Sequence, residues 1–217
     1  MSTPDPVYRL SQFPTSVVSD AIDELGLCGV ISGVHAVRAD QPRIAGRALP
    51  VRLQPKSSDP AAYRFGGGVG KPLEQVLKTM QDGDVVVMDL GGSDRAAAWG
   101  GLASLIAQRR GVRGTVMWGS CRDVDEIRAS GYPVWTAHVS PRRSRNDFTF
   151  GAIGEPITIG TVTVAPRDYV VADASGVIVI PADRIDDVLA QCERIAQQEA
   201  VLASNILNDS LSSWDDV

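Results

Sequence analysis

Apolar residues recur with two different periods along this chain, and their alternation predicts an α/β fold. Short apolar runs at 84–90 and 114–118 are typical of strands that are buried on both faces. Between them, Leu102, Leu105 and Ile106 recur at helical spacing, and Gly111 stands where a helix would end. Strand, helix and strand in about thirty residues predict a right-handed βαβ unit with two parallel strands.

The residues before this unit predict two helices and a strand. Apolar residues on one face predict a helix over 14–25, and Pro72 begins a second helix over 73–80. The segment 44–53 alternates as a strand, and Pro50 places it near a sheet edge or a bulge. The glycine-rich segment 54–71 lacks the spacing and the Ser/Thr of a phosphate-binding loop, so we interpret it as a mobile loop beside the ligand pocket.

The residues after the unit predict further strands and a long helix. A helix over 124–129 and a strand over 133–139 precede a polar turn. From Phe148 onward, short alternating runs predict strands, with a hairpin over 157–164 and a tight turn at 173–176. The last element is a long helix that begins at 182 and ends at about residue 207, with apolar residues on one face.

The predicted βαβ unit also indicates where a ligand binds, because parallel strands end at the same edge of a sheet and ligands bind beyond those ends. At this edge the amides of Gly101, Leu102 and Ala103 begin a helix, where free N–H groups attract anions. Arg122 follows the second strand and completes a carboxylate clamp, and Asp123 adds a hard oxygen ligand. Spacing alone favours the structural alternative, in which Arg122 forms an ion pair and Asp123 caps the next helix.

Composition narrows the class of protein. The chain has 217 residues, of which 44% are hydrophobic and 22% charged, as expected of one globular domain. The net charge of −5, without a long basic block, argues against nucleic-acid binding, and no apolar run predicts a signal peptide or a membrane span. We therefore expect a cytoplasmic protein. Three scattered cysteines predict reduced thiols, and only two histidines predict oxygen ligands for any metal, which favours Mg²⁺ or Mn²⁺.

The residues around Arg122 resemble one known family. Residues 119–127 read G-S-C-R-D-V-D-E-I and 131–135 read G-Y-P-V-W, which is similar to the RraA-like proteins and the 4-hydroxy-4-methyl-2-oxoglutarate (4-carboxy-4-hydroxy-2-oxoadipate) aldolases. The signature of that family is an acidic residue, twenty intervening residues and Arg-Asp. Arg122 and Asp123 match its second half, whereas Gly101 stands where the aldolases have Asp. Segments 15–22 and 160–181 also resemble the family, so the resemblance extends over nearly the whole chain.

The resemblance implies a fold and an assembly. The fold is a swivelling-type α/β/β/α sandwich, with a single domain over 1–217, a leader over 1–13 and a tail over 208–217 that are free to be flexible. The assembly is a homotrimer or a homohexamer built as a dimer of trimers. In such an assembly Glu199, on the long C-terminal helix, reaches the site of a neighbouring subunit; the alternative is an exposed helical glutamate.

The resemblance also implies roles at the site. Arg122 holds the carboxylate of a pyruvyl group and stabilises the enolate, with the backbone from Gly100 to Ala103 beside it. Asp123 carries the divalent metal, Mg²⁺ or Mn²⁺. No side chain at Gly101 supports a metal-bound water, and loss of such a partner typically costs about 10 to 100-fold in metal affinity or activity.

We therefore predict a metal-dependent lyase for small 2-oxo acids, which cleaves 4-hydroxy-2-oxo diacids or decarboxylates oxaloacetate to give pyruvate. The alternative is a non-catalytic regulatory protein that resembles the RraA-type inhibitor of ribonuclease activity. Substrate choice is assigned to loops 54–71 and 140–147, where Arg142, Arg143 and Arg145 either reach a distal carboxylate or stay solvated. We interpret His138 as a core or rim residue, with a catalytic base as the alternative.

Overall fold

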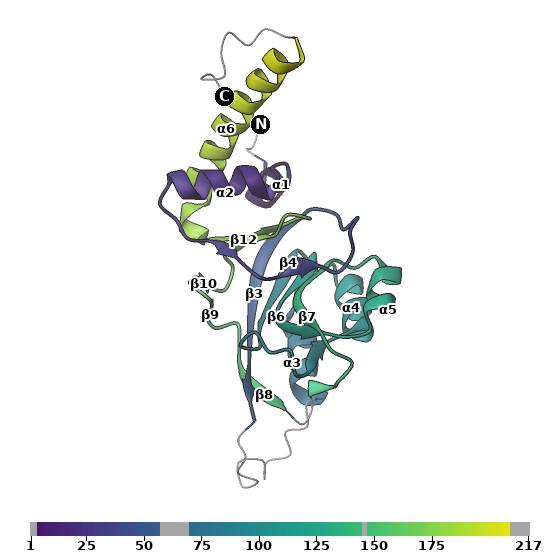
Figure 1. The fold of residues 1–217 in the computed structure, drawn as a ribbon. Helices are drawn as coiled ribbons and strands as arrows, with labels where there is room; N and C mark the ends of the chain where they lie inside the picture. Colours follow the sequence, from purple (N-terminus) through teal and green to yellow (C-terminus); the bar gives the residue numbers. More distant parts are fainter. Residues whose placement is uncertain (1–3, 57–69, 145–146, 209–217) are drawn as a thin grey trace.

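A single strongly curved sheet forms the centre of the protein, and helices cover it on two sides (Figure 1). The computed structural model describes residues 4–56, 70–144 and 147–208. The strands of this sheet are β1 (Val30–Ile31), β2 (His35–Ala36), β3 (Ile44–Pro55), β4 (Asp84–Asp89), β5 (Ala97–Trp99), β6 (Gly114–Cys121), β7 (Val134–Val139), β8 (Phe148–Ile153), β11 (Tyr169–Ala172) and β12 (Val177–Ile180). Their order is β1-β12-β11-β3-β4-β6-β7-β2, with β5 beside β6 and β8 beside β3.

In the described part of the chain, six helices and a small hairpin complete the fold. The helices are α1 (Pro6–Ser11), α2 (Thr15–Glu24), α3 (Gly70–Thr79), α4 (Gly101–Arg109), α5 (Val124–Ser130) and α6 (Ile185–Leu207), the last preceded by a 3₁₀ turn at Ala182–Arg184. The hairpin pairs β9 (Ile157–Ile159) with β10 (Val162–Val164), as predicted. Among the described residues, no helix is long and apolar enough to span a bilayer.

Three parallel crossovers build the middle of the sheet. Strands β3, β4, β6 and β7 are parallel neighbours, and α3, α4 and α5 connect them in turn. The predicted βαβ unit is β4–α4–β6 and is confirmed. Pro50 does not mark a sheet edge, because β3 lies between β4 and two antiparallel partners, but it lies near a bulge, as the alternative predicted: the β3–β8 register shifts between Arg52 and Leu53. On the side of β3 away from β4, β11 pairs with residues 44–47 and β8 pairs with residues 51–55. Pro50 lies between these two antiparallel ladders.

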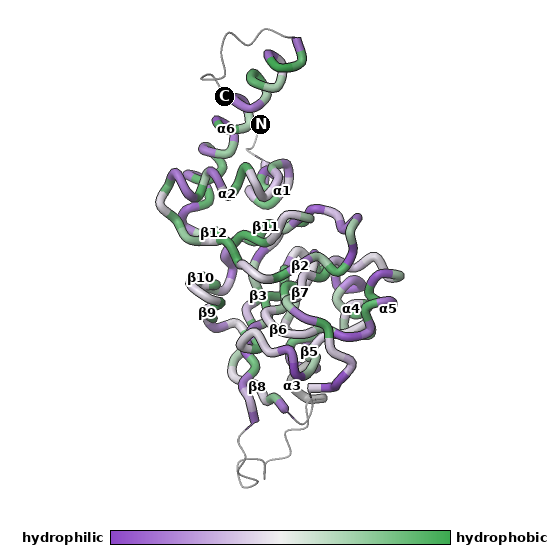
Figure 2. The backbone as a smooth tube through the Cα atoms, viewed as in Figure 1, coloured by the Kyte–Doolittle hydropathy of each residue, from purple (hydrophilic) through white to green (hydrophobic). Residues whose placement is uncertain are grey.

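The predicted α/β/β/α sandwich is confirmed, and its two β layers are parts of one sheet that curls back on itself. One apolar cluster lies between α3, α4, α5 and the parallel strands, and a second lies inside the curl with β9 and β10. A third cluster lies between β11, β12 and the helices α1, α2 and α6. Figure 2 shows β11 and β12 in the green of apolar residues, as expected of strands covered on both faces.

The first and last described helices, α1 and α6, lie in one layer together with α2 (Figure 1). Part of the leader belongs to the fold, because 6–11 form α1 and its Leu10 is fully buried. The first half of α6 packs as predicted, and the second half extends beyond α1 and α2. Most of loop 54–71 (57–69), Arg145 and 209–217 of the tail lie outside the described residues.

Candidate functional site

The predicted site residues meet where β5 and β6 end. Strand β5 was not predicted, and it lies parallel to the end of β6, which extends to Cys121 rather than to Trp118. The N–H of Arg122 donates to the carbonyl of Trp99 at 3.0 Å, which joins the two strand ends directly. Helix α4 begins two residues after Trp99, and α5 begins two residues after Arg122. The starts of both helices therefore lie side by side, with Arg122 and Asp123 between them.

Asp123 does not cap its own helix, so this half of the structural alternative is wrong, whereas Arg122 does form the ion pair of its other half. Its side chain makes no capping hydrogen bond to α5. Instead, its Oδ2 accepts the N–H of Gly101, the first residue of α4, at 3.2 Å. The Nε of Arg122 lies 3.5 Å from the same oxygen. Asp123 has left-handed backbone angles (φ 55°, ψ 45°), a conformation that costs energy for most residues and is often kept at functional sites.

Two glycines leave room for this arrangement. A Cβ at position 100 would lie 2.5 Å from Oδ2 of Asp123. A Cβ at position 101 would lie 2.9 Å from the Cβ of Glu126, on the first turn of α5. A side chain at position 100 would displace the Asp123 carboxylate, and one at position 101 would push against the stem of Glu126. Gly100 and Gly101, predicted as backbone ligands, therefore also have a steric role.

A buried hydrogen-bond pair fixes the start of α4. The indole Nε1 of Trp99 donates to Oγ of Ser104 at 2.9 Å, and that hydroxyl donates to the carbonyl of Gly100 at 3.1 Å. Both side chains are almost fully buried. The pair holds the glycine turn against the body of the protein. Sequence reasoning missed it, and the only signal was a tryptophan immediately before two glycines.

The amides behind Asp123 suit an anion. The N–H groups in the first turn of a helix have no acceptor within that helix, and the positive end of its dipole lies there. Asp123 takes the N–H of Gly101, so Leu102 and Ala103 are the predicted amides left for a ligand. The side chains of Arg122 and Asp123 are each 36% exposed, so a ligand can reach them from solvent. A guanidinium, two amides and a carboxylate can together bind a small acid and a cation.

The carboxylates here fit a magnesium-type cation. Asp123 is partly exposed, and its orientation is fixed by one amide. Glu126 lies on the same helix turn, and no described cluster of three or more His, Cys, Asp or Glu side chains exists. A cation bound here would have one or two carboxylate ligands, and water or substrate would occupy the other positions, as is usual for Mg²⁺.

Helix α4 packs through small residues rather than through its large ones. Its buried side chains are those of Ala103, Ser104 and Ala107. The apolar residues that predicted the helix face solvent instead: Leu102 is 78% exposed, Leu105 47% and Ile106 40%. The helix prediction is confirmed, and this apolar face is uncovered and lies next to the site.

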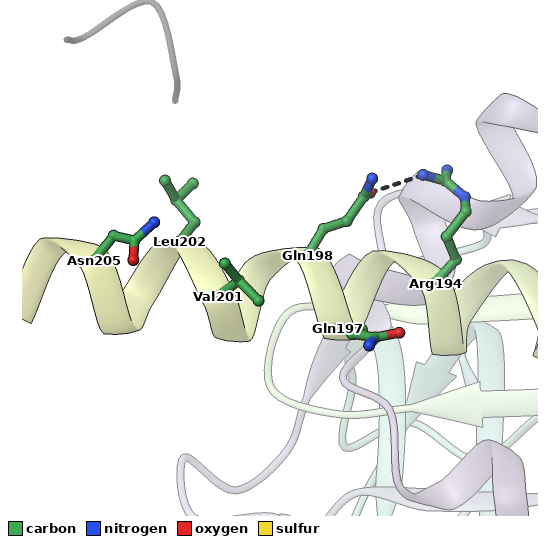
Figure 3. Close-up of a pocket in the computed structure, with 6 residues that line it drawn as sticks. All are labelled: Arg194, Gln197, Gln198, Val201, Leu202 and Asn205. Atoms are coloured by element: carbon green, nitrogen blue, oxygen red, sulfur yellow. Dashed lines mark hydrogen bonds between the residues drawn. The ribbon is translucent and has the colours of Figure 1, made fainter. Parts of the chain in front are cut away.

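Glu199 does not meet the other predicted residues within one chain. It is exposed on the half of α6 that extends away from α4 and α5 (Figure 1). Figure 3 shows a groove on this half, and its described lining residues all belong to α6. Within it, Arg194 Nη1 donates to Gln198 Oε1 at 2.7 Å. Val201, in this groove, is 57% exposed, and Leu207 near the end of the helix is 84% exposed.

The remaining candidates have varied surroundings. His138 lines a cavity of about 410 Å³ at the β2–β7 edge, with His35 and Arg128. Arg142 donates to Oδ1 of Asp147 at 2.9 Å, so part of its charge is already paired. The backbone of Arg143 pairs with that of Ala97 in β5 as an isolated parallel β-bridge.

Cys121 is not suited to nucleophilic chemistry. Its side chain is fully buried at the end of β6, and burial raises the pKa of the thiol. The thiolate, which is the reactive form, is therefore disfavoured.

Comparisons with known proteins identify relatives of this chain. The sequence model of the RraA-like family, described as Aldolase/RraA, matches residues 15–179. Protein DlpA of Legionella pneumophila is 28% identical over 209 residues, which cover 95% of this chain and 32% of DlpA. The chain therefore spans about a third of that relative's length.

Two further relatives are matched along most of their length. A protein of Halalkalibacterium halodurans, named "Putative 4-hydroxy-4-methyl-2-oxoglutarate aldolase", is 30% identical over 193 residues, covering 88% of this chain and 83% of its own. The crystal structure of Streptomyces coelicolor RraAS2, described as an unusual member of the RNase ES inhibitor RraA protein family, superposes with a TM-score of 0.80. It is 26% identical and covers 94% of this chain and 98% of its own.

Proposed function

This chain belongs to the RraA-like family, and we propose that it is a divalent-metal-dependent carbon–carbon lyase for small 2-oxo acids. The proposed reactions are retro-aldol cleavage of a 4-hydroxy-2-oxo diacid and decarboxylation of oxaloacetate, each of which releases pyruvate. One observation carries the proposal: the Asp123 carboxylate is held between the first amide of α4 and the Arg122 guanidinium, although its own helix offers it a cap. A relative that is named an aldolase supports the reaction class.

The substrate's carboxylate would lie against Arg122 and the free amides of Leu102 and Ala103. In the cleavage, the bond between C3 and C4 breaks, its electron pair stays on C3, and the C4 hydroxyl loses its proton. In the decarboxylation, the same electron pair is left on C3 as carbon dioxide departs. Both reactions give the enolate of pyruvate, which is then protonated at C3. Arg122 is positioned to stabilise this charge as it develops, where preorganised cations contribute most.

Asp123 would hold the divalent cation at this place, with Glu126 beside it. When bound, such a cation supplies Lewis-acid stabilisation of the oxygen that becomes negatively charged. The Gly101 N–H keeps Asp123 in one orientation, so little reorganisation is needed when the cation binds.

We further propose that the site is completed by a second copy of the chain, in a homotrimer or a homohexamer, and that Glu199 is the residue it contributes. Two features support this proposal. The outer half of α6 carries Glu199 and exposed apolar residues beyond the body of its own chain. The exposed apolar face of α4 lies directly beside Arg122 and Asp123, where a neighbouring helix would cover it.

The central experiment follows pyruvate release from oxaloacetate and from 4-hydroxy-4-methyl-2-oxoglutarate, with and without Mg²⁺. We expect metal-dependent release that falls at least about 100-fold in Arg122→Ala, since this variant removes the stabilising charge. Arg109→Ala, an exposed arginine at the far end of the same α4 helix, is the matched control and should retain activity. Release that is equal in Arg122→Ala and the control would contradict the proposal.

The same assay tests whether the site is shared. Arg122→Ala and Glu199→Ala chains, each inactive alone, are unfolded together and refolded as a mixture. If a site uses Arg122 from one copy and Glu199 from another, some mixed sites contain both residues and activity returns. An inactive mixture of correctly assembled chains would contradict the contribution of Glu199 in trans.

A non-catalytic binding protein is the second candidate, and Gly101 favours it. The family signature has an acid at this position, and a structural relative is described as a member of an RNase inhibitor family. In this case no 2-oxo acid is turned over, and the exposed face of α4 with Leu102 binds a protein partner. Absence of pyruvate release together with a partner interaction that Leu102→Asp abolishes would support this alternative.

A further inference from the structure

Position 101 has no side chain, and a neighbouring glutamate fills the space where one would lie. A Cβ built on Gly101 would lie 2.9 Å from Cβ of Glu126 and 3.7 Å from its Cγ. The glutamate reaches this place from the first turn of α5, which lies beside the start of α4. The stem of Glu126 therefore lies against the same backbone from which an acidic residue at 101 would extend.

Glu126 also lies near Asp123. Asp123 immediately precedes α5, and Glu126 lies on the first turn of that helix. A Cβ at 101 would lie 3.6 Å from Cβ of Asp123, so both side chains face the first residue of α4. The intervening Asp125 faces elsewhere: its side chain is 95% exposed and pairs with Arg128 at 3.4 Å.

We propose that Glu126 is the second carboxylate of the Asp123 site and serves there in place of a side chain at position 101. This inference rests on the proposed function for the identity of the site, and it assigns a positioning role. Glu126 strengthens the hold of Asp123 on a divalent cation and orients water near it. The glycine at 101 is then part of the same arrangement, because a side chain there would displace Glu126.

The experiment removes the carboxylate at position 126 of α5 and, in one variant, introduces a carboxylate at position 101 of α4. Binding of Mn²⁺ alone to the full-length chain is measured from the EPR signal of free Mn²⁺, so the readout does not depend on turnover. The variants are Glu126→Gln, Glu126→Ala and the double variant Gly101→Asp/Glu126→Gly. Asp123→Asn is the positive control for loss of the site, and Asp125→Asn removes an equal charge one residue from Glu126.

We expect Glu126→Gln and Glu126→Ala to weaken Mn²⁺ binding about 10-fold or more, as is typical when a supporting partner of a metal ligand is lost. Asp125→Asn should change binding by less than about twofold, because exposed charges interact weakly across water. The double variant should recover binding to within about threefold of the natural sequence, since glycine at 126 removes the Cβ that lies 2.9 Å from the new side chain and Asp at 101 then supplies the carboxylate.

Binding in Glu126→Gln that equals that of Asp125→Asn, with Asp123→Asn still deficient, would overturn this inference and leave the proposed reaction untouched. A double variant no better than Glu126→Ala would also overturn the exchange of the two positions. A chain that binds Mn²⁺ through Asp123 and Glu126 but releases no pyruvate would contradict the proposed reaction and keep the inference. Absence of Mn²⁺ binding in the natural sequence would overturn the inference directly.

Discussion

Two aspartates that follow strands of the same sheet, Asp173 and Asp123, have opposite surroundings. Asp173 follows β11, and its side chain is 13% exposed. It accepts the N–H and the hydroxyl of Thr15 at 2.9 and 2.5 Å and the N–H of Ser175 at 2.9 Å, with Arg43 3.6 Å away. Asp123 follows β6, is 36% exposed, and accepts one N–H at 3.2 Å.

The difference separates a carboxylate that the fold uses fully from one that is available to an external ligand. Asp173 joins the start of α2 to the turn after β11. The groups that donate hydrogen bonds to its carboxylate belong to Thr15 and Ser175 of the same chain. Asp123 keeps lone pairs open toward solvent, and its left-handed backbone gains no cap in return. A carboxylate with few internal donors keeps lone pairs available for an external ligand, which agrees with the role proposed for Asp123.

The largest expected effect on stability is at Asp173. Asp173→Ala removes the acceptor of both the N–H and the hydroxyl of Thr15, which is buried at the start of α2. We expect the free energy of unfolding to fall by about 3 kcal/mol, because buried donors are left without partners. Urea denaturation at neutral pH measures this. A loss below about 1 kcal/mol would mean that Asp173 is no more structural than Asp123.

A smaller effect is expected in the pH dependence of the contribution that Asp173 makes to the free energy of unfolding. Burial by itself would raise the pKa of Asp173, but the hydrogen bonds from Thr15 and Ser175 and the charge of Arg43 lower it below its ordinary value of 3.8. Because the pKa is lower in the folded state, the stabilisation is present above 3.8 and is lost as the pH falls through the folded value.

The measurement compares urea denaturation of the natural sequence and Asp173→Asn between pH 7 and pH 3. We expect the difference between their unfolding free energies to narrow as the pH falls below about 4. Burial raises the pKa of Asp84 and Asp168, so their protonation favours folding in acid. Both residues are present in the natural sequence and in Asp173→Asn, so their effect cancels in the difference between the two unfolding free energies. A difference in unfolding free energy that stays constant down to pH 3 would contradict the role given to the ionised Asp173.

The smallest effect on stability is expected at Asp123. Asp123→Asn should change the free energy of unfolding by less than about 0.5 kcal/mol, because asparagine tolerates left-handed backbone angles and the site is partly exposed. The same variant should lose Mn²⁺ binding and pyruvate release. A large loss of stability in urea would place Asp123 with Asp173 as a structural residue and would remove the contrast between them.

Sequence reasoning predicted most elements, because their apolar periods reflect burial on one face or two. It placed Arg122 and Asp123 at the correct sheet edge, since parallel strands have a common edge. It did not predict β5, whose three residues carry too little pattern. It also gave no indication that α4 packs through Ala103 and Ala107, because small side chains contribute little to an apolar period.

The sequence by itself determined the order of the elements, the βαβ unit, the family signature at Arg122 and Asp123, and the glycine in place of the family's acid. Only the tertiary structure decided which residues meet there. Asp123 accepts an amide of α4 instead of capping α5, and Glu126 fills the space beside Gly101. The physical reason is that local sequence fixes periodicity and backbone preference, whereas contact between the starts of two helices depends on how the strands before them pair.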